Sequence, residues 1–115
     1  MKDNLIADKT FDFALNIIDL YINLKKENEF VLSKQLLLAG TSIGANVEES
    51  TAAQSKNDFI SKISIASKEA RETRYWLRLY EKSNLTNIPM TNHLEEIEHI
   101  INILTKIVKT SKSNQ

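Results

Sequence analysis

The sequence predicts an all-α protein, an antiparallel up-and-down four-helix bundle. Apolar residues recur at three- and four-residue spacings in four segments that short breaks separate. Two Gly and one Pro among 115 residues leave little turn material for a chain of many short strands. Short connections make neighbouring helices antiparallel. We therefore expect a single domain over residues 1–115, with helices at about 10–27, 33–54, 56–84 and 89–112.

The first helix is predicted from apolar residues at helical spacing. Thr10 is a candidate N-cap, and a start nearer Asn4 is the alternative. The run from Glu27 to Glu29 is expected to end the helix. The apolar positions are Phe11, Ala14, Ile17, Ile18, Tyr21, Ile22 and Leu24.

The second helix is predicted to begin at Ser33, a residue type that favours the N-cap. A row of seven residues follows at heptad spacing, typical of a buried helix face. The row contains Leu32, Leu36, Ala39, Ile43, Asn46, Ser50 and Ala53. A buried Asn46 would fix the helix register through a polar contact, or line a ligand pocket with Glu49. We favour the structural interpretation.

Gly40 and Gly44 lie four residues apart inside this helix, where each lowers helix stability by about 1 kcal/mol relative to Ala. Close approach of another helix is the favoured explanation, and a hinge is the alternative. Ala66 and Ala70 on the third helix are the expected neighbours.

The third helix is predicted to be capped by Ser55, with Asp58 at capping-box spacing. Its expected buried row contains Phe59, Ile63, Ala66, Ala70, Thr73, Leu77 and Tyr80.

The fourth helix is expected to carry Pro89 in its first turn, and Asn92 with Glu95 is the alternative cap pair. Its buried row contains Leu94, Ile97, Ile101, Leu104 and Val108, widened by Ile100, Ile103 and Ile107. Together with Ile65, Trp76 and Leu79 on the third helix, this apolar surface exceeds what a small bundle must bury. The excess indicates a surface for self-association.

Composition excludes several classes of protein. Cys is absent, so disulfides and thiolate metal sites are excluded. No stretch approaches the roughly 20 apolar residues of a membrane span, and no signal-peptide pattern is seen, so a cytoplasmic protein without a membrane partner is expected. Fifteen basic and fifteen acidic residues give zero net charge, whereas dedicated nucleic-acid binders usually carry a basic excess.

The third helix is the exception to this balance, because residues 56–84 carry seven basic and four acidic side chains. Its cations form a stripe at three- and four-residue spacing: Lys68, Arg71, Arg74, Arg78 and Lys82. Interleaved Glu69, Glu72 and Glu81 favour a solvated face with intrahelical ion pairs. The alternative is a phosphate-binding stripe beside Tyr75 and Trp76, which could stack on bases.

Catalytic and metal motifs are nearly absent. Glu96 and His99 form one Glu-x-x-His pair, whereas di-iron bundles need two such pairs and two further Glu. No Gly-rich phosphate loop and no nucleophile–base set are evident. We therefore expect no catalytic residues, no metal, no cofactor and no enzyme activity.

Two central stretches resemble the four-helix bundle family of the bacterial 23S rRNA intervening sequence proteins, which is related to the accessory variability protein of diversity-generating retroelements. The first comprises residues 32–36 and 41–49, and the second comprises residues 56–59, 62, 65–66, 68–70, 72–73 and 75–79. The resemblance covers nearly the whole chain. It implies a ring-like homopentamer without enzyme activity.

The resemblance also assigns positions within the family motifs. Asn46, Glu49, Glu69, Glu72 and Trp76 match these positions, and we interpret them as structural or interface residues. The accessory variability protein is a basic pentamer that binds nucleic acid and a reverse transcriptase. This chain lacks that basic character, and Leu38 stands where many members carry a basic residue.

Two hypotheses of function follow. The first is an interaction scaffold whose partner is itself, as a homo-oligomer and a pentamer by resemblance. The alternative is a nucleic-acid-binding accessory protein that uses the stripe on the third helix. Zero net charge favours the first hypothesis.

Overall fold

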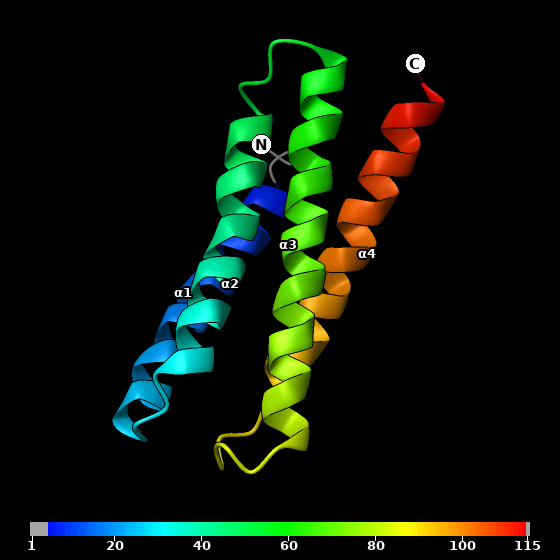
Figure 1. The fold of residues 1–115 in the computed structure, drawn as a ribbon. Helices are drawn as coiled ribbons and strands as arrows, with labels where there is room; N and C mark the ends of the chain where they lie inside the picture. The colour runs from blue at the N-terminus through cyan, green and yellow to red at the C-terminus, as the bar shows by residue number, and fades with distance from the viewer. Residues whose placement is uncertain (1–4, 115) are drawn as a thin grey trace.

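Four helices form the bundle in the computed structural model, which describes residues 5–114 (Figure 1). Consecutive helices run in opposite directions, and within this range no strand occurs, so the predicted all-α fold is confirmed. The helices are α1 (Leu5–Lys26), α2 (Val31–Ser50), α3 (Lys56–Lys82) and α4 (Thr91–Ser113). None of them is long and apolar enough to cross a lipid bilayer.

The core lies between all four helices and is continuous from end to end. The row predicted for α3 is nearly correct, since six of its seven residues are buried: Ile63, Ala66, Ala70, Thr73, Leu77 and Tyr80. The seventh, Phe59, is half-buried, and Ile60 is buried beside it. Tyr80 and Leu77 are among the largest fully buried side chains.

Helix α1 begins earlier than the main prediction. Thr10 lies within the helix with its side chain buried, and its hydroxyl donates to the carbonyl oxygen of Ile6 at 2.9 Å. The N-cap assignment is therefore wrong, because this hydroxyl bonds backward along the helix instead of closing its start. The alternative start nearer Asn4 agrees better, although Asn4 itself lies outside the described residues.

Helix α1 ends where expected, in a Schellman motif. Asn28 adopts a φ of 66°, its N–H donates to the Lys25 carbonyl oxygen at 2.9 Å, and the Glu29 N–H donates to that of Leu24 at 3.0 Å. Asn tolerates this left-handed conformation better than most residues.

Helix α2 begins at Val31, two residues before the predicted N-cap Ser33. The Ser33 hydroxyl donates to the Glu29 carbonyl oxygen at 2.7 Å, so it cannot cap the helix that follows it. The helix stops at Ser50, short of Ala53, in a turn where the Thr51 N–H donates to the Glu48 carbonyl oxygen at 3.2 Å.

The cap predicted for α3 is confirmed. Ser55 accepts the Asp58 N–H at 3.0 Å, and the Asp58 carboxylate accepts the Gln54 N–H at 3.2 Å. Helix α4 begins at Thr91 with Met90 at the N-cap, so both Pro89 in the first turn and an Asn92–Glu95 cap pair are wrong. The Met90 side chain is buried in the core, which fixes how the chain enters α4.

Both glycines of α2 lie against α1. A Cβ at Gly40 would approach Cγ2 of Ile17 to 2.9 Å, and one at Gly44 would approach the Thr10 carbonyl oxygen to 3.3 Å. This agrees with close packing, but the neighbour is α1 and not the expected Ala66 and Ala70 of α3. Small residues therefore set the α1–α2 distance.

Candidate interaction surfaces

An exposed apolar surface runs along α1 and continues onto α2, and we call it the α1–α2 face. It consists of Phe11, Leu15, Ile18 and Ile22 on α1 and Leu38 on α2. Leu15 is 52% exposed and Phe11 is 59% exposed, although both are large apolar side chains. The four α1 residues follow a 4-3-4 spacing, which places them on one side of the helix.

A groove of about 280 Å³ hollows this face between the two helices. Gly44 lies in it, so the close helix crossing and the groove share a residue. The remaining lining is mostly apolar, and Glu48 is its one charged residue: Ala7, Phe11, Ala14, Leu15, Ile18, Thr41, Ala45 and Glu48.

The location of the excess apolar surface differs from the prediction. On α4, Ile100 is buried while Ile103 and Ile107 are half-buried, and Ile65, Trp76 and Leu79 on α3 are also half-buried. Phe11, Ile18 and Ile22 of α1, which were predicted only as apolar positions at helical spacing, are exposed.

The sequence carried a signal for this arrangement. Helix α1 has two rows of large apolar residues, each with 4-3-4 spacing. The core takes the row of Phe13, Ile17, Leu20 and Leu24. The other row contains Phe11, Leu15, Ile18 and Ile22, and this bundle leaves it facing solvent.

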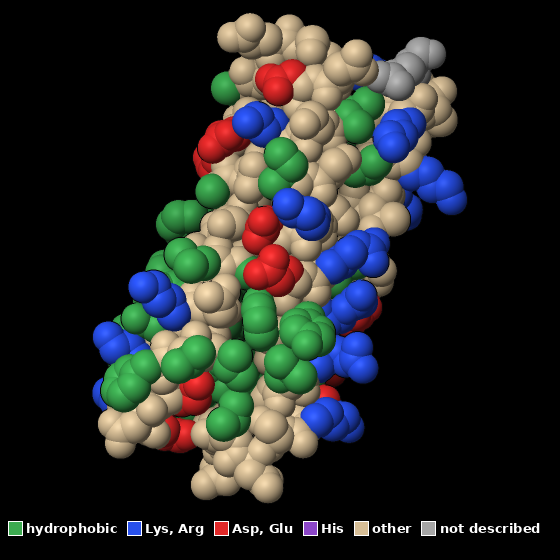
Figure 2. All heavy atoms as spheres, viewed as in Figure 1, with side chains coloured by type: hydrophobic (Ala, Val, Ile, Leu, Met, Phe, Trp, Pro, Cys, Tyr) green, Lys and Arg blue, Asp and Glu red, His purple; other side chains and the backbone are tan. Residues whose placement is uncertain are grey.

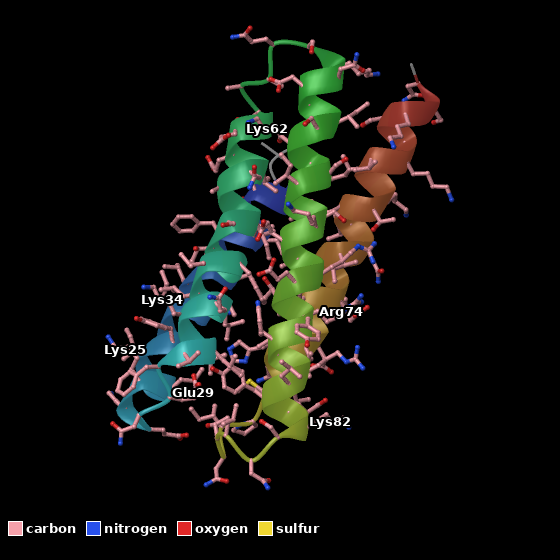
Figure 3. All side chains as sticks on the ribbon, viewed as in Figure 1. Lys25, Glu29, Lys34, Lys62, Arg74 and Lys82 are labelled. Carbon is pink, nitrogen blue, oxygen red and sulfur yellow. The ribbon has the colours of Figure 1, made fainter. Side chains whose placement is uncertain are left out.

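The cations of the stripe on α3 are mostly unpaired in the described structure. Figure 2 shows lysine and arginine side chains following the α3–α4 edge of the molecule. Lys68, Arg71, Arg78 and Lys82 are exposed, and within residues 5–114 none of them joins an ion pair. Arg74, labelled in Figure 3, pairs with Glu98 of α4. The intrahelical pairs expected with Glu69, Glu72 and Glu81 therefore do not form in the described structure.

The aromatic residues beside the stripe are partly engaged. Tyr75 and Trp76 meet edge to face with ring centroids 5.2 Å apart. The Trp76 indole N–H donates to the Glu72 carboxylate at 3.2 Å, which brings two predicted motif residues together. The Tyr75 side chain is 54% exposed.

The other motif residues lie apart from this cluster. Glu49 of α2 pairs with Lys62 of α3 at 3.0 Å, and its hydrogen bond and charge raise the pKa of Lys62. Asn46 is half-buried and donates to the Ser42 carbonyl oxygen at 2.9 Å within its own helix, so the polar contact expected to fix the helix register is intrahelical. Val47 takes the buried position beside it. The Glu69 carbonyl oxygen accepts the Thr73 hydroxyl at 2.8 Å.

Glu29 joins three helices and had not been predicted as important (Figure 3). Its carboxylate accepts the backbone N–H groups of Ser33 at 2.8 Å and Leu32 at 3.2 Å, which caps α2. It also accepts the Tyr80 hydroxyl of α3 at 2.6 Å. Burial raises the pKa of Glu29, but the hydrogen bonds from Tyr80, Ser33 and Leu32 outweigh it and hold the pKa below the usual value. Burial and the Glu29 carboxylate raise the pKa of Tyr80.

The Glu96–His99 pair does not extend into a metal-binding group. His99 Nδ1 lies 3.9 Å from Glu96 Oε1, and Lys9 Nζ lies 3.6 Å from the same oxygen. Across residues 5–114, no three His, Cys, Asp or Glu side chains are placed to hold a metal ion. His93 lines a separate polar pocket between α1 and α4 with Asn16 and Asp19.

Comparisons with known proteins agree with this fold. The family model of the 23S rRNA-intervening sequence protein matches residues 2–107. A crystal structure of a protein of unknown function from the S23 ribosomal protein family of Bacteroides thetaiotaomicron is similar, with a TM-score of 0.85 and 43% sequence identity. The similarity covers 91% of this chain and 99% of that one. Among curated proteins, none matches the chain.

Proposed function

Since this chain belongs to the 23S rRNA-intervening sequence protein family, whose similar solved member has no known function, we propose that it is a non-enzymatic interaction scaffold that self-associates. The α1–α2 face is the observation that carries the proposal. A second copy of the chain covers this face in the proposed assembly, and the family resemblance implies five copies in a ring.

Several properties of the α1–α2 face support an interface role. Soluble monomers rarely expose contiguous rows of large apolar side chains. Burying such side chains against another molecule contributes about 25 cal/mol for each Å² of apolar surface removed from water. The groove beside Gly44 offers a recess for a side chain from another molecule. In a ring, each copy uses two different surfaces, and the α1–α2 face is one of them.

Leu15→Lys tests this proposal with little risk to the fold. Leu15 is more than half exposed, and Asp12 and Asp19 lie three and four residues away on the same helix. A Lys at position 15 therefore gains helical ion pairs while placing a charge in the proposed interface. Ser61→Lys is the matched control, because Ser61 is an exposed α3 residue three positions after Asp58.

Analytical ultracentrifugation reports the outcome. We expect an oligomer for the wild-type chain and for Ser61→Lys, and a monomer with unchanged helical circular dichroism for Leu15→Lys. A monomeric wild-type chain at micromolar concentration would refute self-association. An intact Leu15→Lys oligomer would refute the assignment of the α1–α2 face.

The unpaired cations of α3 favour a second candidate function, a nucleic-acid-binding accessory protein. Four of the five stripe residues keep their charge uncompensated by ion pairs in the described structure. Binding through phosphate contacts must weaken steeply as salt rises. A titration with structured RNA and DNA at two salt concentrations tests this candidate, and no binding at low salt would exclude it.

A further inference from the structure

A second groove, of about 400 Å³, lies between α3 and α4 beside the C-terminal half of α4. We propose that this groove binds the phosphodiester backbone of a nucleic acid strand without reading its bases. This inference rests on the second candidate function, nucleic-acid binding, and does not depend on self-association. The lining residues are Ser64, Ser67, Arg71, Thr105, Val108, Lys109 and Lys112.

The charge of this groove is uncompensated. Its lining holds three cations and three hydroxyl groups, and none of its residues is acidic. Within residues 5–114, Arg71, Lys109 and Lys112 form no ion pair. The chain contains no Asp or Glu after Glu98, so α4 brings only lysines to this part of the bundle.

The opposite end of the α3–α4 pair has the reverse character. A surface hollow there is lined by four carboxylates, those of Glu81, Glu95, Glu96 and Glu98. The predicted stripe runs toward this acidic end, where Glu98 already pairs with Arg74. A polyanion is therefore attracted to the groove near Lys109. The carboxylates of the hollow repel it from the C-terminal end of α3.

The donors of the groove are suited to phosphate oxygens. The Arg71 guanidinium donates to Thr105 Oγ1 at 3.2 Å, which holds the side chain across from α3 to α4. A guanidinium has five N–H donors, so others remain for a phosphate. Lys109 and Lys112 are three residues apart, about 4.5 Å along the helix axis and on the same side of the helix. The helix dipole favours basic residues in the last turn of a helix, and Lys112 is the one basic residue of the last turn of α4. The dipole therefore does not explain why Lys109 is also basic.

The openness of the groove favours a chain over a small phosphate compound. Five of its seven lining residues are exposed, whereas a small-molecule site usually encloses most of its ligand. The lining has no aromatic ring, so bases have no stacking platform there. Contacts to phosphates alone carry little sequence information. We therefore expect binding that depends on salt and is indifferent to sequence.

Fluorescence anisotropy with a labelled single-stranded RNA of about 20 nucleotides tests the groove. With three phosphate contacts, the wild-type affinity should fall roughly 20-fold between about 50 and about 200 mM salt. Changing Arg71, Lys109 and Lys112 together to Gln should weaken binding at low salt at least about tenfold and flatten the salt dependence.

A matched triple variant controls for the loss of net charge. It changes Lys26, Lys34 and Lys56 to Gln, three exposed cations that lie outside both the groove and the stripe on α3 and form no ion pair in the described structure. We expect its affinity to stay within about twofold of wild type, because it leaves all three groove contacts in place. Lys109→Glu alone is the second probe if the triple variant loses helical circular dichroism, and it should also weaken binding.

The outcomes separate the hypotheses. If the control triple loses as much affinity as the groove triple, binding follows net charge alone and the groove inference is overturned. If the wild-type chain binds no RNA at low salt, both the groove and the nucleic-acid candidate fail, while self-association is unaffected. Equal affinity for polyglutamate or for anionic vesicles would overturn the phosphodiester assignment. A strong preference between uridine and adenosine homopolymers would overturn binding without base recognition.

Discussion

The two hairpins of this bundle present different surfaces to solvent. The α1–α2 hairpin exposes a row of large apolar side chains along α1, whereas the α3–α4 hairpin exposes mainly lysines, arginines and glutamates, with Tyr75 and Leu85 as its exposed large apolar side chains within the described residues. Both hairpins contribute to the same continuous core. A four-helix bundle needs one buried apolar stripe on each helix, so folding explains the buried row of α1 but not the exposed one. The buried row stabilises the fold, and the exposed row is available for contact with another molecule.

Truncating one residue from each apolar row of α1 should give the largest difference in stability. Ile17 is 0% exposed, so Ile17→Ala should lower the free energy of unfolding by about 2–5 kcal/mol. Ile22 is 47% exposed, so Ile22→Ala should cost less than about 0.5 kcal/mol. Urea denaturation of both variants in the Leu15→Lys background removes the contribution of assembly. Equal losses would show that both rows belong to the core.

The next largest effect concerns the close crossing within the first hairpin. Gly40→Ala should destabilise the protein by about 2 kcal/mol, because the new methyl group meets Ile17 at 2.9 Å. This loss occurs although Ala favours a helix by about 1 kcal/mol over Gly. Thermal unfolding of Gly40→Ala measures it. The double variant Gly40→Ala with Ile17→Ala should lose less stability than the sum of the losses of the two single variants, because the smaller side chain at position 17 leaves room for the new methyl group. A strictly additive result would mean that these two residues do not compete for space.

A smaller effect is expected at the connection between the hairpins. Glu29→Gln should cost about 1.5 kcal/mol at neutral pH, because bonds from two N–H groups and a hydroxyl lose their charged acceptor. The folded pKa of Glu29 is depressed, so its contribution is fully present above the unfolded pKa and is lost as pH falls through the folded value. Unfolding curves from pH 7 down to acid should therefore converge for wild type and variant. Glu95→Gln, at an exposed position of α4, is the control and should show no such convergence.

The smallest effect lies at the start of the second hairpin. Ser55→Ala removes the acceptor of the Asp58 N–H and should cost about 1 kcal/mol. Ser61→Ala changes the same residue type at an exposed position inside α3 and should be nearly neutral. Chemical denaturation of the two variants gives the comparison. A negligible loss for Ser55→Ala would indicate that packing alone determines where α3 begins.

Local sequence patterns predicted α3 better than α1. Ser55 caps α3 as expected, and Ile63 through Tyr80 lie in the predicted buried row, since α3 carries one dominant apolar stripe. Helix α1 carries two, and periodicity alone does not say which of them meets the core. Thr10 and Ser33 were misread as caps because their residue types favour caps, although both hydroxyls bond backward to carbonyl groups.

The candidate sites depend on contacts between distant parts of the chain. The stripe on α3 was visible as spacing, but the pairing of Arg74 with Glu98 joins residues of different helices. The groove likewise combines Arg71 of α3 with Lys109 and Lys112 of α4. Which residues meet across two helices depends on their rotation about their axes, which composition and spacing leave open. Self-association was predicted from excess apolar residues on the third and fourth helices, whereas the structure exposes a row of large apolar side chains on α1.

The position of Glu29 also has a consequence for the order of folding. Its bonds to Ser33 and Leu32 span four residues or fewer, so they form together with the turn between α1 and α2. Its bond with Tyr80 spans 51 residues, and this contact closes only when α3 has docked. The carboxylate therefore first caps the start of α2 and later, once α3 has packed, accepts the Tyr80 hydroxyl. Contacts made late are the ones that slow unfolding, so the Tyr80 hydroxyl should govern how long the native bundle persists more than how quickly it forms.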